Sequence, residues 1–486
     1  MKRDARGPWA GGTSRRILIV AACVAGVVLL AAIVLSRVGL EAYKPRVQAV
    51  ASAALGQDVR IRGRMAIGVF PGVHLSLGDV HVLTRGGAEF ASFRRTDVWV
   101  ALLPLLYGDV RLDKVALAGA SLTVARGKDG QYNVGPLERA RGLALSRHLS
   151  NLSLSDGSLR YQDAASGKQF ELRGCELNVK GLRLGSGNPA ERLKRLSFTA
   201  QFACREAGGS NVTLSDIKLH AVAKDGVFDV DPATLRVFGG SAAGTVHADL
   251  SGPVPSFVVR GSLAQFRIEE FFATFSPRKS VEGLMDFSAN LALHGSTDRE
   301  LMRTAQGEVG LRGRDLTLHG NDVDRVLRRF ESSQNFSLVD VGAYVLVGPF
   351  GPAVTKGINF AGNLQGAGGE TRIGLAVSEW RVADGVAQAK DVAMATSTNR
   401  IAMQGGLDFV HQRFADVTLA VVDANGCARV RQRVVGSFAK PVVEKPRVLT
   451  SLAGPVVELL GRMRRVLPSG PCKAFYAGSV PAPQRR

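Results

Sequence analysis

The feature that most constrains this chain is an uncharged apolar stretch near its N-terminus, Ile17 to Leu35. It holds nineteen residues without a charged side chain or a proline, and twelve of them are isoleucine, leucine or valine. A helix of that length spans about 28 Å, close to the hydrocarbon thickness of a bilayer. We therefore expect a single transmembrane helix over these residues.

Charges on either side of this stretch indicate its orientation. Residues 1–16 carry five lysines or arginines and one aspartate, whereas residues 36–46 carry three basic residues and one glutamate. The positive-inside rule favours a cytoplasmic N-terminus, with the rest of the chain outside the cytoplasm. The alternative is a cleaved signal peptide, whose apolar core is normally about 7–15 residues long. Because this core is longer and Ser36-Arg37-Val38 is a poor cleavage site, an uncleaved anchor is favoured.

The net charge of +20 is concentrated at the C-terminal end. Twelve lysines or arginines and two glutamates fall within residues 427–486, and the middle of the chain is close to balanced. Outside the cytoplasm a basic segment meets anionic lipid more often than nucleic acid, so we interpret this end as lipid-facing or simply solvated. Nucleic-acid binding is a third hypothesis, which predicts tight, salt-sensitive binding of DNA.

Four of the five cysteines lie outside the apolar stretch, where an oxidising compartment permits disulfides. Pairing the nearest neighbours predicts Cys175–Cys204 and Cys427–Cys472, which close loops of 29 and 45 residues. This is the simplest of three connectivities, and free thiols are the alternative. No C-x-x-C spacing indicates a zinc site or a redox motif.

Apolar and polar residues alternate along much of the chain, as in Ile217, Leu219 and Ala221 around Lys218 and His220. A period of two places the apolar side chains on one face of a strand. Asp-Gly or Asn-Gly pairs indicate hairpin turns at 129–130, 156–157, 225–226, 384–385 and 425–426. The sequence therefore predicts a mainly β fold with largely antiparallel strands. A barrel or sandwich would bury the apolar face on protein, and a long curled sheet would leave it as a groove; both have this period.

A few helices are expected between the strands. Their apolar spacing and stop signals place them at Glu41–Leu55, Pro136–His148, Gln265–Phe275, Thr297–Ala305 and Asn321–Ser333. The third residue after Thr297 is Glu300, which is the spacing of a capping box. We divide the chain into residues 1–16, 17–35, 42–140, 141–320, 321–445 and 446–486.

A further helix is expected in the basic C-terminal segment, beginning near Val456. Arg462, Arg464 and Arg465 fall near its end, where the helix dipole favours cations. One interpretation is a helix that caps the open end of the sheet with its arginines in water. The other is an amphipathic element whose three arginines contact an anionic lipid surface.

Motifs for catalysis are missing from the sequence. Eight histidines form no metal-binding spacing, and no G-x-S-x-G, Walker A or G-x-G-x-x-G sequence occurs. We therefore expect no enzyme, no catalytic residue, no metal site and no cofactor.

Five segments allow a comparison with a known family: 43–82, 98–126, 330–360, 386–419 and 436–453. They resemble AsmA-like proteins of Gram-negative bacteria. The resemblance implies an inner-membrane protein with a periplasmic body, tied to outer-membrane assembly. The wider group is similar to bridge-like lipid-transfer proteins, so the resemblance also implies an elongated, curled sheet that encloses an apolar groove.

Two functions are open at this point. The first is a single-pass inner-membrane protein that carries or guides phospholipid, or another envelope lipid, between the inner and outer membranes. The second is a non-catalytic scaffold or assembly factor that modulates insertion of outer-membrane proteins. Expected partners are lipid, the inner membrane and outer-membrane components, with no nucleic acid.

Overall fold

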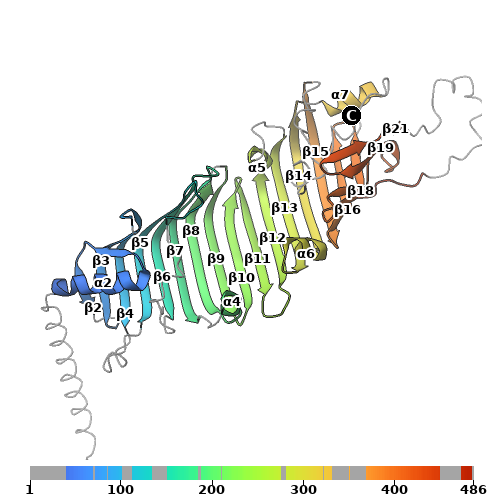
Figure 1. Ribbon diagram of the computed structural model, residues 1–486. Coiled ribbons are helices and arrows are strands. Elements are labelled where there is room, and N and C mark those ends of the chain that lie inside the picture. The colour runs from blue at the N-terminus through green and yellow to red at the C-terminus, as the bar shows by residue number, and fades with distance from the viewer. Residues whose placement is uncertain are drawn as a thin grey trace, which may run out of the picture. The chain divides into compact units, whose positions relative to one another are not determined.

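The computed structural model describes residues 40–68, 72–84, 86–100, 112–133, 150–183, 188–209, 211–274, 281–320, 322–330, 350, 368–448 and 472–483 (Figure 1). Contacts within the chain separate two compact units, Met1–Arg183 and Leu184–Arg486. Strands dominate both units, which confirms the mainly β class. The stretch Ile17–Leu35 and the helix expected at Pro136–His148 lie outside the described residues.

The N-terminal unit is a sheet with one helix against its first strands. The sheet is antiparallel apart from the parallel pair β5–β6, and both β1 and β2 pair with β3. The helix packs Val47 and Ala51 on a core formed by β1 to β4. Its elements are η1 Leu40–Tyr43, α2 Lys44–Leu55, β1 Asp58–Ile61, β2 Met65–Gly68, β3 His74–Leu83, β4 Glu89–Val100, β5 Leu112–Arg126, β6 Asn151–Asp163 and β7 Gln169–Arg183.

In the C-terminal unit the strands from β8 to β19 each pair antiparallel with the next along the chain, and β20 and β21 pair with β19. The strands are β8 Ser197–Gly209, β9 Thr213–Lys224, β10 Val227–Val237, β11 Gly240–Asp249, β12 Ser256–Arg267, β13 Val281–His294, β14 Gln306–His319, β15 Glu370–Ala383, β16 Val386–Thr396, β17 Arg400–Asp408, β18 Arg413–Val422, β19 Ala428–Ser437, β20 Lys440–Val443 and β21 Arg447–Val448. The helices are α4 Pro189–Lys194, α5 Ile268–Ala273, α6 Asp298–Thr304 and α7 Val323–Phe330.

Bulges at aspartate residues interrupt several strands. Asp79 has a φ of 49° inside β3, and it separates Leu77 from Val80 and Val82, which all belong to one core. The extra residue shifts the alternation by one position, so apolar side chains on both sides of the bulge stay on the same face. Aspartates with a φ near 50° occur in the same way at 156, 216, 315 and 416.

The hairpin turn expected at Asp156–Gly157 is wrong for this reason. Asp156 has a φ of 50° and lies within β6, where the register with β7 shifts. Aspartate and glycine tolerate the left-handed conformation that both a turn and a bulge require, so the dipeptide alone does not separate them. The pairs at 225–226, 384–385 and 425–426 do lie between consecutive antiparallel strands, and 129–130 lies in a turn after β5.

Four of the five expected helices lie at least partly in the described residues, and all four form there; one of them is much shorter than expected. The expected helix at Gln265–Phe275 is reduced to α5, because β12 continues to Arg267 and Phe266 pairs with Met285 of β13. Sheet pairing has overridden the helical spacing of this segment. The first helix ends at Leu55 as expected, with Gly56 at a φ of 67° as its C-cap.

Helix α6 begins at the expected cap. The Thr297 hydroxyl accepts from the Glu300 N–H at 3.2 Å, and the Glu300 carboxylate accepts from the Ser296 N–H at 2.7 Å. We expect Thr297→Ala to lower the free energy of unfolding by about 1 kcal/mol, because one N–H of the first turn loses its acceptor. Urea denaturation checks this, with Ser296→Ala as the control, since only the backbone of Ser296 takes part in the cap. Equal losses in both variants would contradict the capping role.

Candidate functional site

One face of strands β8 to β13 is apolar and crosses six strands without a charged side chain. Cross-strand partners build three parallel rows on this face, each with one residue per strand. Six strands spaced at about 4.8 Å give each row a length of roughly 24 Å. The rows are Phe198, Ala223, Phe228, Ala248, Phe257 and Leu293; Ala200, Ala221, Val230, Val246, Val259 and Leu291; and Phe202, Leu219, Ala233, Gly244, Gly261 and Ala289.

Most side chains in these rows are half-buried rather than buried. Val246, Val259 and Leu291 keep part of their surface in contact with solvent, although each lies between apolar neighbours. Among the described helices, α5 and α6 pack on β13 and α7 packs on β15. Phe271 of α5 also meets Phe238, in the turn after β10, at 5.7 Å, but Phe238 lies beyond the three rows. The apolar face therefore has no second layer over its middle strands within the part of the chain that the structure describes.

The opposite face of the same strands carries the charged and most of the polar side chains. Asp229 and His247 pair across β10 and β11 at 2.6 Å, and His220 contacts the carbonyl of Asp231 at 3.0 Å. Asn290 and Arg260, which follow the apolar row residues Ala289 and Val259, are exposed. The polar face is therefore suited to contact with water. The apolar face is suited to a nonpolar partner, which would gain dispersion contacts and removal from water there.

The apolar face is closed over β14 to β19 by protein. Trp380 of β15 is fully buried beside Val309, and its ring meets Phe350 edge to face at 5.6 Å. Phe350 also contacts Phe409 at 5.0 Å, and α5 and α7 contribute Phe272 and Leu327 to the same core. Leu291 and Phe287 pack against this core from its margin, so the open rows run directly into it.

The N-terminal unit carries a similar apolar row. Leu75, Val98, Val115, Leu152 and Val179 are consecutive cross-strand partners from β3 to β7. The row continues through the parallel pair β5–β6 without a change of face. Near β1 the apolar face of this unit is covered by α2.

The C-terminal segment 472–483 covers the other face of the last strands. Val480 is fully buried, and Phe475 and Tyr476 are nearly so, in a cluster with alanines of β16 to β18. The Tyr476 hydroxyl donates to Asp391 Oδ1 at 2.5 Å and accepts from the Val480 N–H at 2.9 Å. Burial, helped by the hydrogen bond to Asp391, raises the pKa of the Tyr476 hydroxyl well above its usual range. This hydroxyl is a structural donor rather than a candidate base.

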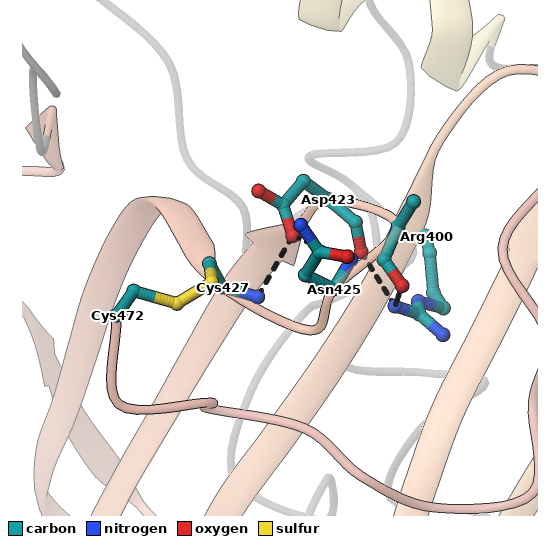
Figure 2. Close-up of a disulfide and its surroundings, with 6 residues drawn as sticks. Arg400, Asp423, Asn425, Cys427 and Cys472 are labelled. Atoms are coloured by element: carbon teal, nitrogen blue, oxygen red, sulfur yellow. Dashed lines mark hydrogen bonds between the residues drawn. A yellow bond between two sulfur atoms is a disulfide. The ribbon is translucent and has the colours of Figure 1, made fainter. Parts of the chain in front are cut away.

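Two further links hold this segment to the sheet (Figure 2). The predicted disulfide Cys427–Cys472 is present, and it joins the segment to the start of β19. The buried Arg400 donates from Nη1 to the Val480 carbonyl at 2.9 Å and from Nη2 to the carbonyl of Asp423. Asp423 in turn accepts from the Cys427 N–H at 2.9 Å. Cys175 and Cys204 are disulfide-bonded as well, so the oxidised state expected from the sequence is confirmed for these cysteines too.

Other residues singled out from the sequence lie outside the described part. These are the ends of the apolar stretch, Ile17 and Leu35, and the three arginines Arg462, Arg464 and Arg465. Within the described residues no histidine, cysteine, aspartate or glutamate side chains cluster in threes that suit a metal ion.

Among the described residues, no helix has both the length and the apolar character that a membrane span requires.

Comparison with known proteins identifies the family. The model of the AsmA family matches residues 14–207 and 199–373, which together extend over most of the 486 residues. The resembling segments 386–419 and 436–453 lie beyond the end of this match. Searches of curated proteins and of solved structures gave no significant match. The family match covers more than half of the sequence, and the chain belongs to the AsmA family.

Proposed function

We propose that this protein carries or guides phospholipid between the inner and outer membranes, with the acyl chains lying on its apolar sheet faces. The Ile17–Leu35 stretch anchors it in the inner membrane, and both units lie in the periplasm. No chemical step is part of this proposal, and neither a cofactor nor nucleic acid takes part. Membership of the AsmA family supports a role in the cell envelope, in outer-membrane assembly or lipid transport.

The open apolar face over β8 to β13 carries this proposal. Three rows of six residues present aliphatic and aromatic side chains, and the described helices leave the middle strands uncovered. Soluble proteins rarely expose large contiguous apolar patches unless something binds there. Acyl chains suit this face because its rows hold no side chain that would need a polar partner.

The basic C-terminal segment has a place in the proposal. Arg462, Arg464 and Arg465 would contact anionic headgroups if the helix expected there lies on a lipid surface. The described residues on either side of the three arginines are held to the sheet, because β21 pairs with β19 and Cys472 is bonded to Cys427. The competing interpretation, a helix that caps the sheet, is equally compatible with these two attachments.

Photo-crosslinking from two adjacent positions tests the proposal. Leu291 lies in the middle apolar row, and Asn290 is exposed on the opposite face of the same strand. We expect a benzoylphenylalanine at 291 of the full chain, in cells, to form phospholipid adducts, because acyl C–H groups lie against that face. The same probe at 290 should form none. Adducts are identified by mass spectrometry of the crosslinked peptide.

This pair separates the two functions. Lipid bound around a membrane anchor would not distinguish 290 from 291, so a difference between them locates lipid on the apolar face. Protein adducts at 291 without lipid adducts would favour the scaffold. Equal lipid adducts at both positions would contradict binding on one face.

A further inference from the structure

Helix α2 is apolar on two sides, and only one side is used by the fold. Val47 and Ala51 pack on the core of β1 to β4. Val50 keeps 71% of its surface exposed, and Tyr43, at the helix cap, keeps 48%. The residues Ala49 and Ala53 are exposed as well. A helix that had only the sheet to satisfy would place polar residues on this outer side.

Charge on the outer side is positive. Arg46 is exposed, and its guanidinium lies 5.9 Å from the centre of the Tyr43 ring. The nearest acidic residue along the chain, Glu41, is engaged by Lys44 at 3.1 Å. This interaction, followed by the hydrogen bond from the Met65 N–H, lowers the pKa of Glu41. The outer side of α2 therefore presents a tyrosine, an arginine and small or aliphatic residues.

The position of α2 in the chain limits what can cover it. Only residues 36–39 separate the end of the apolar stretch, Leu35, from the start of η1 at Leu40. Five fully extended steps reach at most about 18 Å. The headgroup layer on one side of a bilayer is itself about 5–8 Å thick, so η1 begins at most about 10–13 Å beyond it. Helix α2 follows η1 directly and therefore lies close to the membrane surface.

We propose that the outer side of α2 lies on the membrane surface, with Tyr43 and Val50 at the boundary between headgroups and acyl chains and Arg46 among anionic headgroups. This inference rests on the membrane anchor in the proposed function. Tyrosine is enriched at that depth because its ring is apolar and its hydroxyl polar, and arginine pairs with phosphate. The contact sets the N-terminal unit against the bilayer by its first helix.

Fluorescence quenching by brominated phospholipid tests this on the full chain. The chain is placed in nanodiscs of phosphatidylethanolamine and phosphatidylglycerol whose acyl chains carry bromine both near the glycerol end and near the terminal methyl, so that both the boundary and the centre of the bilayer are probed. Cys23→Ala removes the cysteine outside the disulfides, and a thiol-reactive dye is attached through Val50→Cys, Gly26→Cys or Leu193→Cys. Residue 26 reports the anchor, and residue 193 is the control, because Leu193 is 43% exposed on helix α4 of the other unit.

We expect the dyes at 26 and 50 to be quenched and the dye at 193 not to be, with roughly half of the signal at 50 lost if the helix lies at the headgroup boundary. Adding Arg46→Glu should reduce quenching at 50 and leave it unchanged at 26. Quenching at 26 but not at 50 would overturn the contact while leaving the anchor intact. No quenching at 26 would overturn the anchor and, with it, the contact.

A dye at 50 that is shielded from aqueous iodide but not quenched by lipid would mean that protein, such as a second copy, covers α2, and would overturn the inference. Equal quenching at 50 and 193 would also overturn the inference.

Discussion

Val259→Asp is expected to reduce lipid binding and lipid transfer by about tenfold or more, which corresponds to at least about 1.4 kcal/mol. Val259 is half-buried in the middle apolar row, between Val246 and Leu291. With lipid bound, a carboxylate at this position would be withdrawn from water against acyl chains that offer no hydrogen bond, which costs several kcal/mol. Without lipid the carboxylate keeps access to solvent, so the sheet itself should tolerate it. Transfer of labelled phospholipid between vesicles, together with lipid adducts from a probe at 291, measures the effect.

The adjacent residue provides a matched control. Val258 is also a half-buried valine of β12, but it points to the polar face, where its register partners are His247 and Ala292. Val258→Asp should therefore leave lipid transfer within about twofold of the unmodified protein, since exposed charges contribute little. A loss of transfer in both variants, with unchanged melting temperatures, would contradict the prediction, because the effect would then come from a charge on β12 whichever face carries it. Unchanged transfer in both would remove β12 from the lipid path.

The alternation of apolar residues is the part of the site that sequence reasoning reached. Ile217, Leu219 and Ala221 were expected on one face of a strand, and they lie on the apolar face of β9. Bulges limited this approach, because a left-handed aspartate moves the alternation by one position, as between Leu77 and Val80. The alternation in the sequence is then interrupted, although the apolar face of the strand is continuous. Alternating apolar residues that change phase by one position at an aspartate are the sequence signal that could have predicted such a bulge.

Which face is covered, and by what, could not be predicted from the period alone. Strands β16 to β18 contain runs such as Val392–Ala395 and Val417–Val422, which are apolar at nearly every position. Such runs indicate burial on both faces, and the second layer here is the segment 472–483. Its burial depends on Tyr476 and Val480, which lie in a proline-containing tail without strand or helix spacing. The disulfide at Cys472 was the one local sign that this tail is held to the sheet.

Trp380→Ala is expected to lower the free energy of unfolding of the C-terminal unit by about 3–5 kcal/mol. Trp380 is fully buried between Val309 and Ala389 on neighbouring strands, and its indole N–H donates to the Ser378 hydroxyl at 2.8 Å. Removing the ring leaves a cavity beside Phe350 at the point where the open apolar face becomes a closed core. Because backbone pairing holds β14 and β16 in place, the cavity is expected to collapse only in part.

Trp99 is the matched control, because it is a half-buried tryptophan of β4 in the N-terminal unit, stacked on His74 at 4.9 Å. Trp99→Ala should cost about 1 kcal/mol, a typical value for a single substitution. Hydrogen exchange resolved by peptide measures each unit separately, which matters because two units need not unfold in one step. We expect Trp380→Ala to speed exchange in β14 to β18 and to leave β3 to β5 unchanged. Equal protection of β14 to β18 in both variants would show that the aromatic cluster around Trp380 does not stabilise the closed end, and that the backbone pairing of these strands suffices.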